Sequence, residues 1–240
     1  MKVTEITRRV RQLLPLRPCS AVIVAAGSAS RMGGVDKILE PLAGVPVILR
    51  TVRAFAECDA IREIVVVTSP ERILPIMQLC APFEKVKAVV AGGETRQASV
   101  RAGMNALQNK SGLVAVQDGA RPLITWQVID RVVRAANTYG AAAPAIPVKD
   151  TVKRVNGGIV AETPDRSTLR AVQTPQVFDF ALLRSALKKA EKENAQVTDD
   201  CSAVERMGMS VKIVEGDERN IKITTPLDMK IAELLLEDME

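Results

Sequence analysis

The chain has 240 residues, of which 47% are hydrophobic and only 2% aromatic, and its formal net charge is +5. This length supports one sizeable domain with its own core, and so few aromatic rings argue against a stacking platform for single-stranded nucleic acid. The positive charge suits polyphosphate substrates, but charge alone selects no function.

The N-terminal residues 1–18 lack the apolar stretch of a secretory signal, and no apolar run approaches the roughly 18 residues that span a bilayer. The cysteines are far apart and form no C-x-x-C pair, so neither a zinc site nor a disulfide framework is indicated. We expect a cytoplasmic protein that binds neither membrane nor nucleic acid. Residues 1–18 are expected to be an N-terminal extension and residues 19–240 a single domain.

Apolar runs typical of strands recur along the chain and alternate with helical patterns. The predicted strands cover residues 21–25, 64–68, 86–91, 113–117, 141–146 and 211–214. The predicted helices cover residues 46–56, 95–107, 126–139, 179–193, 198–207 and 227–237, with Pro46 in a first helical turn and Thr198 as an N-cap. This order predicts an α/β fold with a mainly parallel, Rossmann-like sheet and helices on both faces.

The segment from about residue 148 to residue 172 interrupts this alternation. It contains short β-like pieces around Asn156, Gly157 and Gly158, which form a hairpin-type turn signal. We interpret it as a β-arm that projects from the domain. Because an apolar projecting strand needs a covering surface, we expect the arm to form a homodimer.

Small residues follow the first predicted strand. The loop contains Gly27, Gly33 and Gly34 and carries the cations Arg31 and Lys37. Backbone N–H groups in such a loop can approach phosphate oxygens closely while the cations supply positive charge. The spacing matches neither the P-loop nor the dinucleotide fingerprint, which makes a nicotinamide dehydrogenase a poor candidate.

Two further strand ends carry candidate site residues. Gly93, Glu94 and Ser99 follow the third predicted strand, and Asp118 and Arg121 follow the fourth. Ligands of open α/β sheets collect at the carboxyl ends of strands, so these loops can enclose one nucleotide. Asp118 is a candidate ligand of Mg²⁺, directly or through water, or of a substrate hydroxyl.

The sequence contains no histidine, which removes the usual general base and the Ser-His and Cys-His mechanisms. A phosphate nucleophile needs no such base, because its second pKa is about 6 and it is largely dianionic at neutral pH. Catalysis can then consist of positioning and charge neutralisation by Arg, Lys and Mg²⁺.

Seven segments together resemble the 2-C-methyl-D-erythritol 4-phosphate cytidylyltransferases, in the family's order and from about Cys19 to the C-terminus. They are AAGSASRMGGVDK, AGGETRQASV, QDGARPLI, PVKDTVKR, TPQVF, TDDCSAVE and VEGDERNIKITTPLD. The resemblance implies that CTP reacts with 2-C-methyl-D-erythritol 4-phosphate, with Mg²⁺ as cofactor, to give the CDP-methylerythritol product and pyrophosphate.

The resemblance also implies roles for individual residues. Four cations would be catalytic: Arg31, Lys37, Arg166 and Lys222. The CTP site would be lined by Ala25, Ala26, Gly27, Gly93, Glu94, Ser99 and Gly119. The methylerythritol phosphate would contact Asp118, Arg121, Thr151, Arg166, Thr198 and Lys222, with Thr151 and Arg166 reaching the substrate held by the other subunit.

The chain departs from the family pattern at a few positions. The loop from Arg31 to Lys37 is shorter, Asp36 stands where proline commonly precedes the lysine, and Gln117 and Gly119 replace the more usual His and Ala. The nearest alternative function is a cytidylyltransferase acting on ribitol 5-phosphate or a related polyol phosphate. An alternative of another class is a noncatalytic nucleotide-binding protein, which could dispense with the cations.

Overall fold

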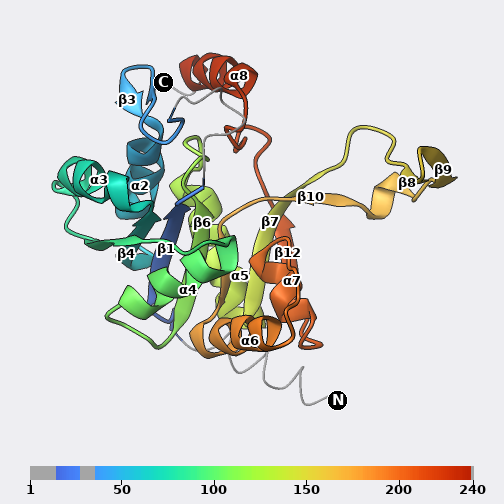
Figure 1. Ribbon diagram of the computed structural model, residues 1–240, viewed down its shortest axis with the longest axis horizontal. Helices are drawn as coiled ribbons and strands as arrows, with labels where there is room; N and C mark the ends of the chain where they lie inside the picture. The colour runs from blue at the N-terminus through green and yellow to red at the C-terminus, as the bar shows by residue number, and fades with distance from the viewer. Residues whose placement is uncertain (1–14, 28–35, 239–240) are drawn as a thin grey trace.

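A computed structural model describes residues 15–27 and 36–238 of the chain (Figure 1). An eight-stranded sheet has the order β10-β7-β11-β6-β1-β4-β5, with β12 also paired to β7. Its strands are β1 (Cys19–Ala25), β4 (Ile61–Thr68), β5 (Val86–Ala91), β6 (Leu113–Asp118), β7 (Ala141–Pro147), β10 (Arg170–Val172), β11 (Gln176–Asp179) and β12 (Lys212–Glu215). Among the described strands of this sheet, β10 and β11 alone run antiparallel to their sheet neighbours, so the predicted mainly parallel sheet is confirmed.

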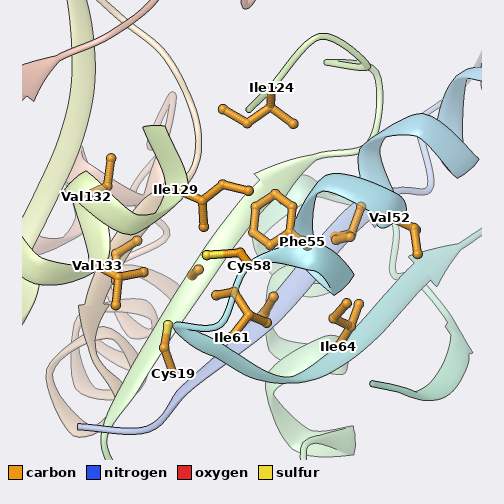
Figure 2. Packing of buried hydrophobic residues seen from close by; sticks show 14 of the residues in the cluster. Cys19, Val52, Phe55, Cys58, Ile61, Ile64, Ile124, Ile129, Val132 and Val133 are labelled. Atoms are coloured by element: carbon orange, nitrogen blue, oxygen red, sulfur yellow. The ribbon is translucent and has the colours of Figure 1, made fainter. Parts of the chain in front are cut away.

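Helices cover both faces of this sheet, as the apolar strands predicted. They are α2 (Val47–Glu57), α3 (Ile73–Cys80), α4 (Arg96–Ala106), α5 (Trp126–Tyr139), α6 (Phe180–Lys192), α7 (Asp200–Glu205) and α8 (Pro226–Glu237). Successive side chains of β1 point to opposite faces: Ile23 packs with α2, α3 and α5, whereas Val22 packs with α4, α6 and α7. Figure 2 shows the first of these clusters, centred on Phe55 of α2.

Local signals placed the predicted helices within two residues, but the roles predicted for Pro46 and Thr198 at two helix starts were wrong. Helix α5 matches its prediction and ends at Gly140, which adopts the left-handed conformation. Pro46 precedes α2 instead of lying in its first turn, because it pairs in the short hairpin of β2 (Pro41–Leu42) and β3 (Val45–Pro46). Thr198 is exposed, and the N-cap of α7 is Asp199, whose side chain accepts the N–H of Ser202 in a capping box.

The predicted β-arm projects from the sheet (Figure 1). Its tip is the exposed hairpin of β8 (Arg154–Asn156) and β9 (Ile159–Glu162). The arm returns through a 3₁₀ helix (Arg166–Thr168) and joins the main sheet, because β10 pairs with the end of β7. Its last three predicted residues are therefore an edge strand of the sheet.

The last residues of the predicted N-terminal extension are attached to the domain. Arg17 donates hydrogen bonds to the Asn137 side chain and to Asp179, which lies 2.8 Å away. Within the described ranges, no helix has both the length and the apolar character needed to cross a bilayer.

Candidate active site

The carboxyl ends of three adjoining parallel strands, β1, β4 and β6, lie at one edge of the sheet, and the loop after the neighbouring β5 meets them there. A cleft of about 480 Å³ opens at this edge. Most of the predicted site residues that the structure describes line this cleft, namely Ala25, Ala26, Gly27, Lys37, Gly93, Glu94, Ser99, Asp118 and Lys222. Segments from four separate parts of the sequence thus converge on one cavity.

The loop after β5 is held in shape by its own side chains. Thr95 caps α4 by accepting the N–H of Ala98 at 3.1 Å, and the buried Ser99 hydroxyl donates to the Thr95 carbonyl and accepts the N–H of Gly93. A Cβ on Gly93 would overlap the Ala98 side chain, so this position requires glycine. Ser99 therefore shapes the loop that borders the cleft.

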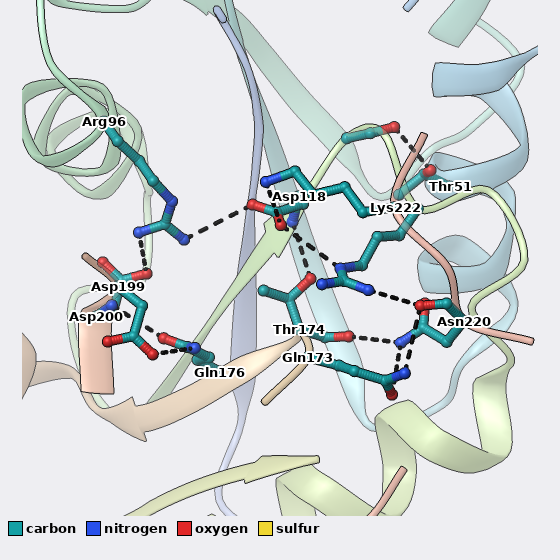
Figure 3. A network of polar contacts seen from close by, with 12 residues as sticks. Thr51, Arg96, Asp118, Gln173, Thr174, Gln176, Asp199, Asp200, Asn220 and Lys222 are labelled. Atoms are coloured by element: carbon teal, nitrogen blue, oxygen red, sulfur yellow. Dashed lines mark hydrogen bonds and ion pairs between the residues drawn. The ribbon is translucent and has the colours of Figure 1, made fainter. Parts of the chain in front are cut away.

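Asp118 lies at the centre of the charged groups in the cleft (Figure 3). One carboxylate oxygen, Oδ2, is 2.9 Å from Lys222 Nζ and 3.5 Å from Arg121 Nε, and the other, Oδ1, is 3.8 Å from an Arg96 guanidinium nitrogen. The Thr174 hydroxyl accepts the backbone N–H of Asp118 at 3.1 Å. Burial of Asp118 opposes its ionisation, but Lys222 and Arg96 favour the carboxylate, and the pKa of Asp118 lies below its ordinary value.

Arg96 was not predicted as a site residue, although it lies inside the quoted segment AGGETRQASV. Its guanidinium bridges Asp118 and the fully buried Asp200, which lies 2.7 Å away. Burial raises the pKa of Asp200, and Arg96 partly counteracts this effect. The Gln176 side-chain oxygen accepts the N–H groups of Asp200 and Cys201, which fixes the start of α7 beside Arg96 (Figure 3).

The segment that carries Lys222 is tied to the end of β6. Arg121 donates to the Asn220 carbonyl at 2.6 Å, and the Ile223 N–H donates to the Ala120 carbonyl at 2.8 Å. The buried Asn220 side chain donates to the Thr174 carbonyl at 3.0 Å. These bonds on both sides of Lys222 hold its backbone next to Asp118.

The other predicted residues that the structure describes lie apart from the lining of the cleft. Arg121 is beside Asp118 but does not line the cleft, and the backbone N–H and C=O of Gly119 are both bonded internally, to Val24 and Thr51. Thr198 is exposed two residues before Asp200. Thr151 and Arg166 are on the arm, where Arg166 donates to the Lys149 carbonyl at 2.6 Å. Arg31 lies outside the described residues.

Comparison with known proteins agrees with this geometry. The family model for 2-C-methyl-D-erythritol 4-phosphate cytidylyltransferase matches residues 19–238. Similar proteins of that name include one from Caldanaerobacter subterraneus, 46% identical over 90% of this chain and 98% of its own length, and one from Geobacillus kaustophilus, 45% identical over 90% and 96%.

Solved structures give the same result. The 4-diphosphocytidyl-2C-methyl-D-erythritol synthase of Anaerococcus prevotii has a TM-score of 0.83 and 30% identity, over 91% of this chain and 96% of that one. The 2-C-methyl-D-erythritol 4-phosphate cytidylyltransferase of Thermus thermophilus has a TM-score of 0.75 and 33% identity, over 90% and 98%. The family model, the relatives and the solved structures agree that this chain belongs to the 2-C-methyl-D-erythritol 4-phosphate cytidylyltransferase family.

Proposed function

We propose that the cleft binds CTP beside 2-C-methyl-D-erythritol 4-phosphate and transfers the cytidylyl group to the phosphate of that acceptor, in the synthesis of isoprenoid precursors. The observation that carries the proposal is that Lys37, Asp118 and Lys222 line one cavity together with the Gly93 loop. A triphosphate placed among these groups meets both ammonium groups and the small-residue backbone that phosphate oxygens can approach. The membership of the family supports the same reaction.

The chemical step can proceed without a protein base. An oxygen of the acceptor phosphate attacks the α-phosphorus of CTP, a new P–O bond forms, and the bond to the β-phosphate oxygen breaks as pyrophosphate leaves with the electron pair. Lys37 and Lys222 would stabilise the negative charge that grows on the α-phosphate and on the leaving group, and Arg31 is proposed to assist them. Asp118, which also pairs with Arg96, would orient Lys222 and the acceptor within the cleft.

We also propose Mg²⁺ as the cofactor. Among the described residues, no three acidic, cysteine or histidine side chains gather as a ready-made metal cage. One carboxylate combined with substrate phosphates is nevertheless an ordinary environment for Mg²⁺, and Asp118 supplies that carboxylate at the cleft wall. When bound, the ion would neutralise charge on the phosphates, as it does in other phosphoryl-transfer sites.

The arm supports the proposal of a homodimer. Its hairpin exposes apolar side chains, with Val155, Ile159 and Val160 being 54%, 75% and 54% exposed. A second copy of the chain could cover them, and Thr151 and Arg166 would then reach the partner's cleft. An Ile159→Asp variant should sediment as a monomer, whereas a dimer as stable as the wild type would refute this role of the arm.

We propose the cytoplasm as the compartment in which the reaction takes place. The support is that Cys19, Cys58, Cys80 and Cys201 are all free and buried, as expected where thiols stay reduced.

A pyrophosphate-release assay with CTP, ATP, GTP and UTP, each with 2-C-methyl-D-erythritol 4-phosphate or ribitol 5-phosphate, tests the function. We expect turnover with CTP and methylerythritol phosphate, a loss of about a hundredfold or more in Lys37→Ala, and none in the exposed control Lys230→Ala. Preference for ribitol 5-phosphate would favour the related polyol-phosphate enzyme. No pyrophosphate with any pair would indicate a noncatalytic nucleotide-binding protein.

A further inference from the structure

Lys37 is on a turn that is fixed by the residue before it. The Asp36 carboxylate oxygen Oδ1 accepts the N–H of Ile38 at 3.2 Å, and the Asp36 carbonyl accepts the N–H groups of Leu39 and Glu40 at 3.0 and 2.9 Å. Ile38 is also buried in the core. The backbone of Lys37 is therefore held between two fixed neighbours, with its side chain at the cleft.

Arg72 connects this turn to the end of β1. Its Nε lies 2.6 Å from the other Asp36 carboxylate oxygen, Oδ2, and its Nη1 lies 3.3 Å from the Ala25 carbonyl oxygen and 3.5 Å from that of Gly27. Ala25 and Gly27 both line the cleft. One guanidinium thus contacts both the end of β1 and the turn that carries Lys37.

The burial of this contact distinguishes it from an ordinary surface ion pair. The Arg72 side chain is 12% exposed and the Asp36 side chain 34% exposed, so solvent screens their attraction less than that of an exposed pair. The planar guanidinium offers donors in fixed directions, which lets it engage a carboxylate and carbonyl oxygens at once. A lysine at position 72 could satisfy these acceptors only in part.

We propose that Arg72 and Asp36 are positioning residues that set the place of the Lys37 ammonium group relative to the nucleotide-binding end of β1. The idea rests on the proposed role of Lys37 in the reaction. Arg72 itself would not touch substrate. A displacement of about 1 Å in a catalytic group can cost on the order of a hundredfold in rate, so a loosened turn should lower turnover measurably.

The first set of variants distinguishes the ion pair between Arg72 and Asp36 from the hydrogen bonds that Asp36 accepts within the turn. We expect Arg72→Met and Asp36→Ala each to lower kcat by about tenfold or more, with little change in the KM of methylerythritol phosphate. Asp36→Asn keeps the acceptor for Ile38 but loses the charge, and Arg72→Lys keeps the charge but loses the planar donors, so both should lie between wild type and the truncations. Arg62→Met, at an exposed position of β4, should leave turnover unchanged.

The decisive test combines Arg72→Met with Lys37→Gln and measures single turnovers at high enzyme concentration. If Arg72 acts through Lys37, adding Arg72→Met to Lys37→Gln should change the rate by less than about twofold. A full tenfold further loss would overturn the proposal, because Arg72 would then act on another part of the site or on the fold. Thermal unfolding of every variant shows whether stability accounts for the loss, and the milder Arg72→Lys replaces Arg72→Met if the latter is unfolded.

Failure of this inference and failure of the proposed function give different results. If Lys37→Gln alone retained wild-type turnover, the proposed role of Lys37 would be wrong. If Lys37→Gln were impaired and Arg72→Met, Arg72→Lys and Asp36→Ala all had wild-type turnover, only the positioning role would be wrong.

Discussion

Replacing Asp118 by Asn tests the charge arrangement of the cleft, because one carboxylate faces three cationic side chains. Removing one partner of a fully buried ion pair costs about 3–5 kcal/mol. The side chains of Lys222 and Arg96 are 41% and 30% exposed, so solvent screens much of their interaction, whereas Arg121 is only 12% exposed. We therefore expect Asp118→Asn to lower the free energy of unfolding by about 2 kcal/mol.

The same substitution should affect ligand binding and turnover in opposite ways. It leaves the cations around position 118 without their shared negative partner, so pyrophosphate measured without Mg²⁺ should bind at least as tightly as it does to the wild type. Turnover should fall by about a hundredfold, because Lys222 loses the group that orients it and the proposed metal loses its carboxylate.

Urea unfolding, calorimetric titration with pyrophosphate and pyrophosphate release measure these three effects, with the exposed Asp59→Asn as the matched control. Unchanged stability combined with weaker pyrophosphate binding would refute the reasoning, since Asp118 would then not be the common counter-charge of the three cations.

Further expectations concern pH, packing and charge. The pKa of Asp118 is lowered in the folded state from its ordinary value of 3.8. The contribution of this carboxylate to stability is therefore present above that value and is lost as the pH falls through the folded-state pKa. The difference in the free energy of unfolding between wild type and Asp118→Asn should shrink in urea titrations below about pH 4. Gly103→Ala should lower the free energy of unfolding by about 1–3 kcal/mol, because a Cβ there would overlap Val22 and lie 2.7 Å from Val67 Cγ2. Urea unfolding measures this loss, and an unchanged midpoint would show that α4 can shift. Lys222→Met keeps the length of the side chain but should lower turnover about a hundredfold in the pyrophosphate assay.

The elements that the sequence predicted well are those with strong local signals. The strands of the sheet centre are continuous apolar runs, and α5 is bounded by Thr125 and Gly140. Helix α3 was not predicted because it has eight residues and contains Pro75, which reads as a helix breaker. Pro75 lies in the first turn, where a missing N–H interrupts no bond of the helix. Strand β11, which ends directly before α6, was not predicted.

The candidate site shows the same division between local and long-range information. Glycine-containing strand ends and the Asp118 turn could be located from neighbouring residues alone. The bridge from Arg96 to Asp118 and Asp200 joins residues that are distant in sequence, and only the folded sheet brings them together. The contact of Arg72 with Asp36 is of this kind too, since nothing near Arg72 in the sequence marks it as part of a site.

The most direct test of the account is a crystal structure of the chain with CTP and Mg²⁺. We predict that the triphosphate lies in the cleft beside Gly93, with phosphate oxygens within hydrogen-bonding distance of Lys37 and Lys222. Binding of CTP elsewhere, for example in the groove that Arg131 and Arg219 line beside α5, would contradict it.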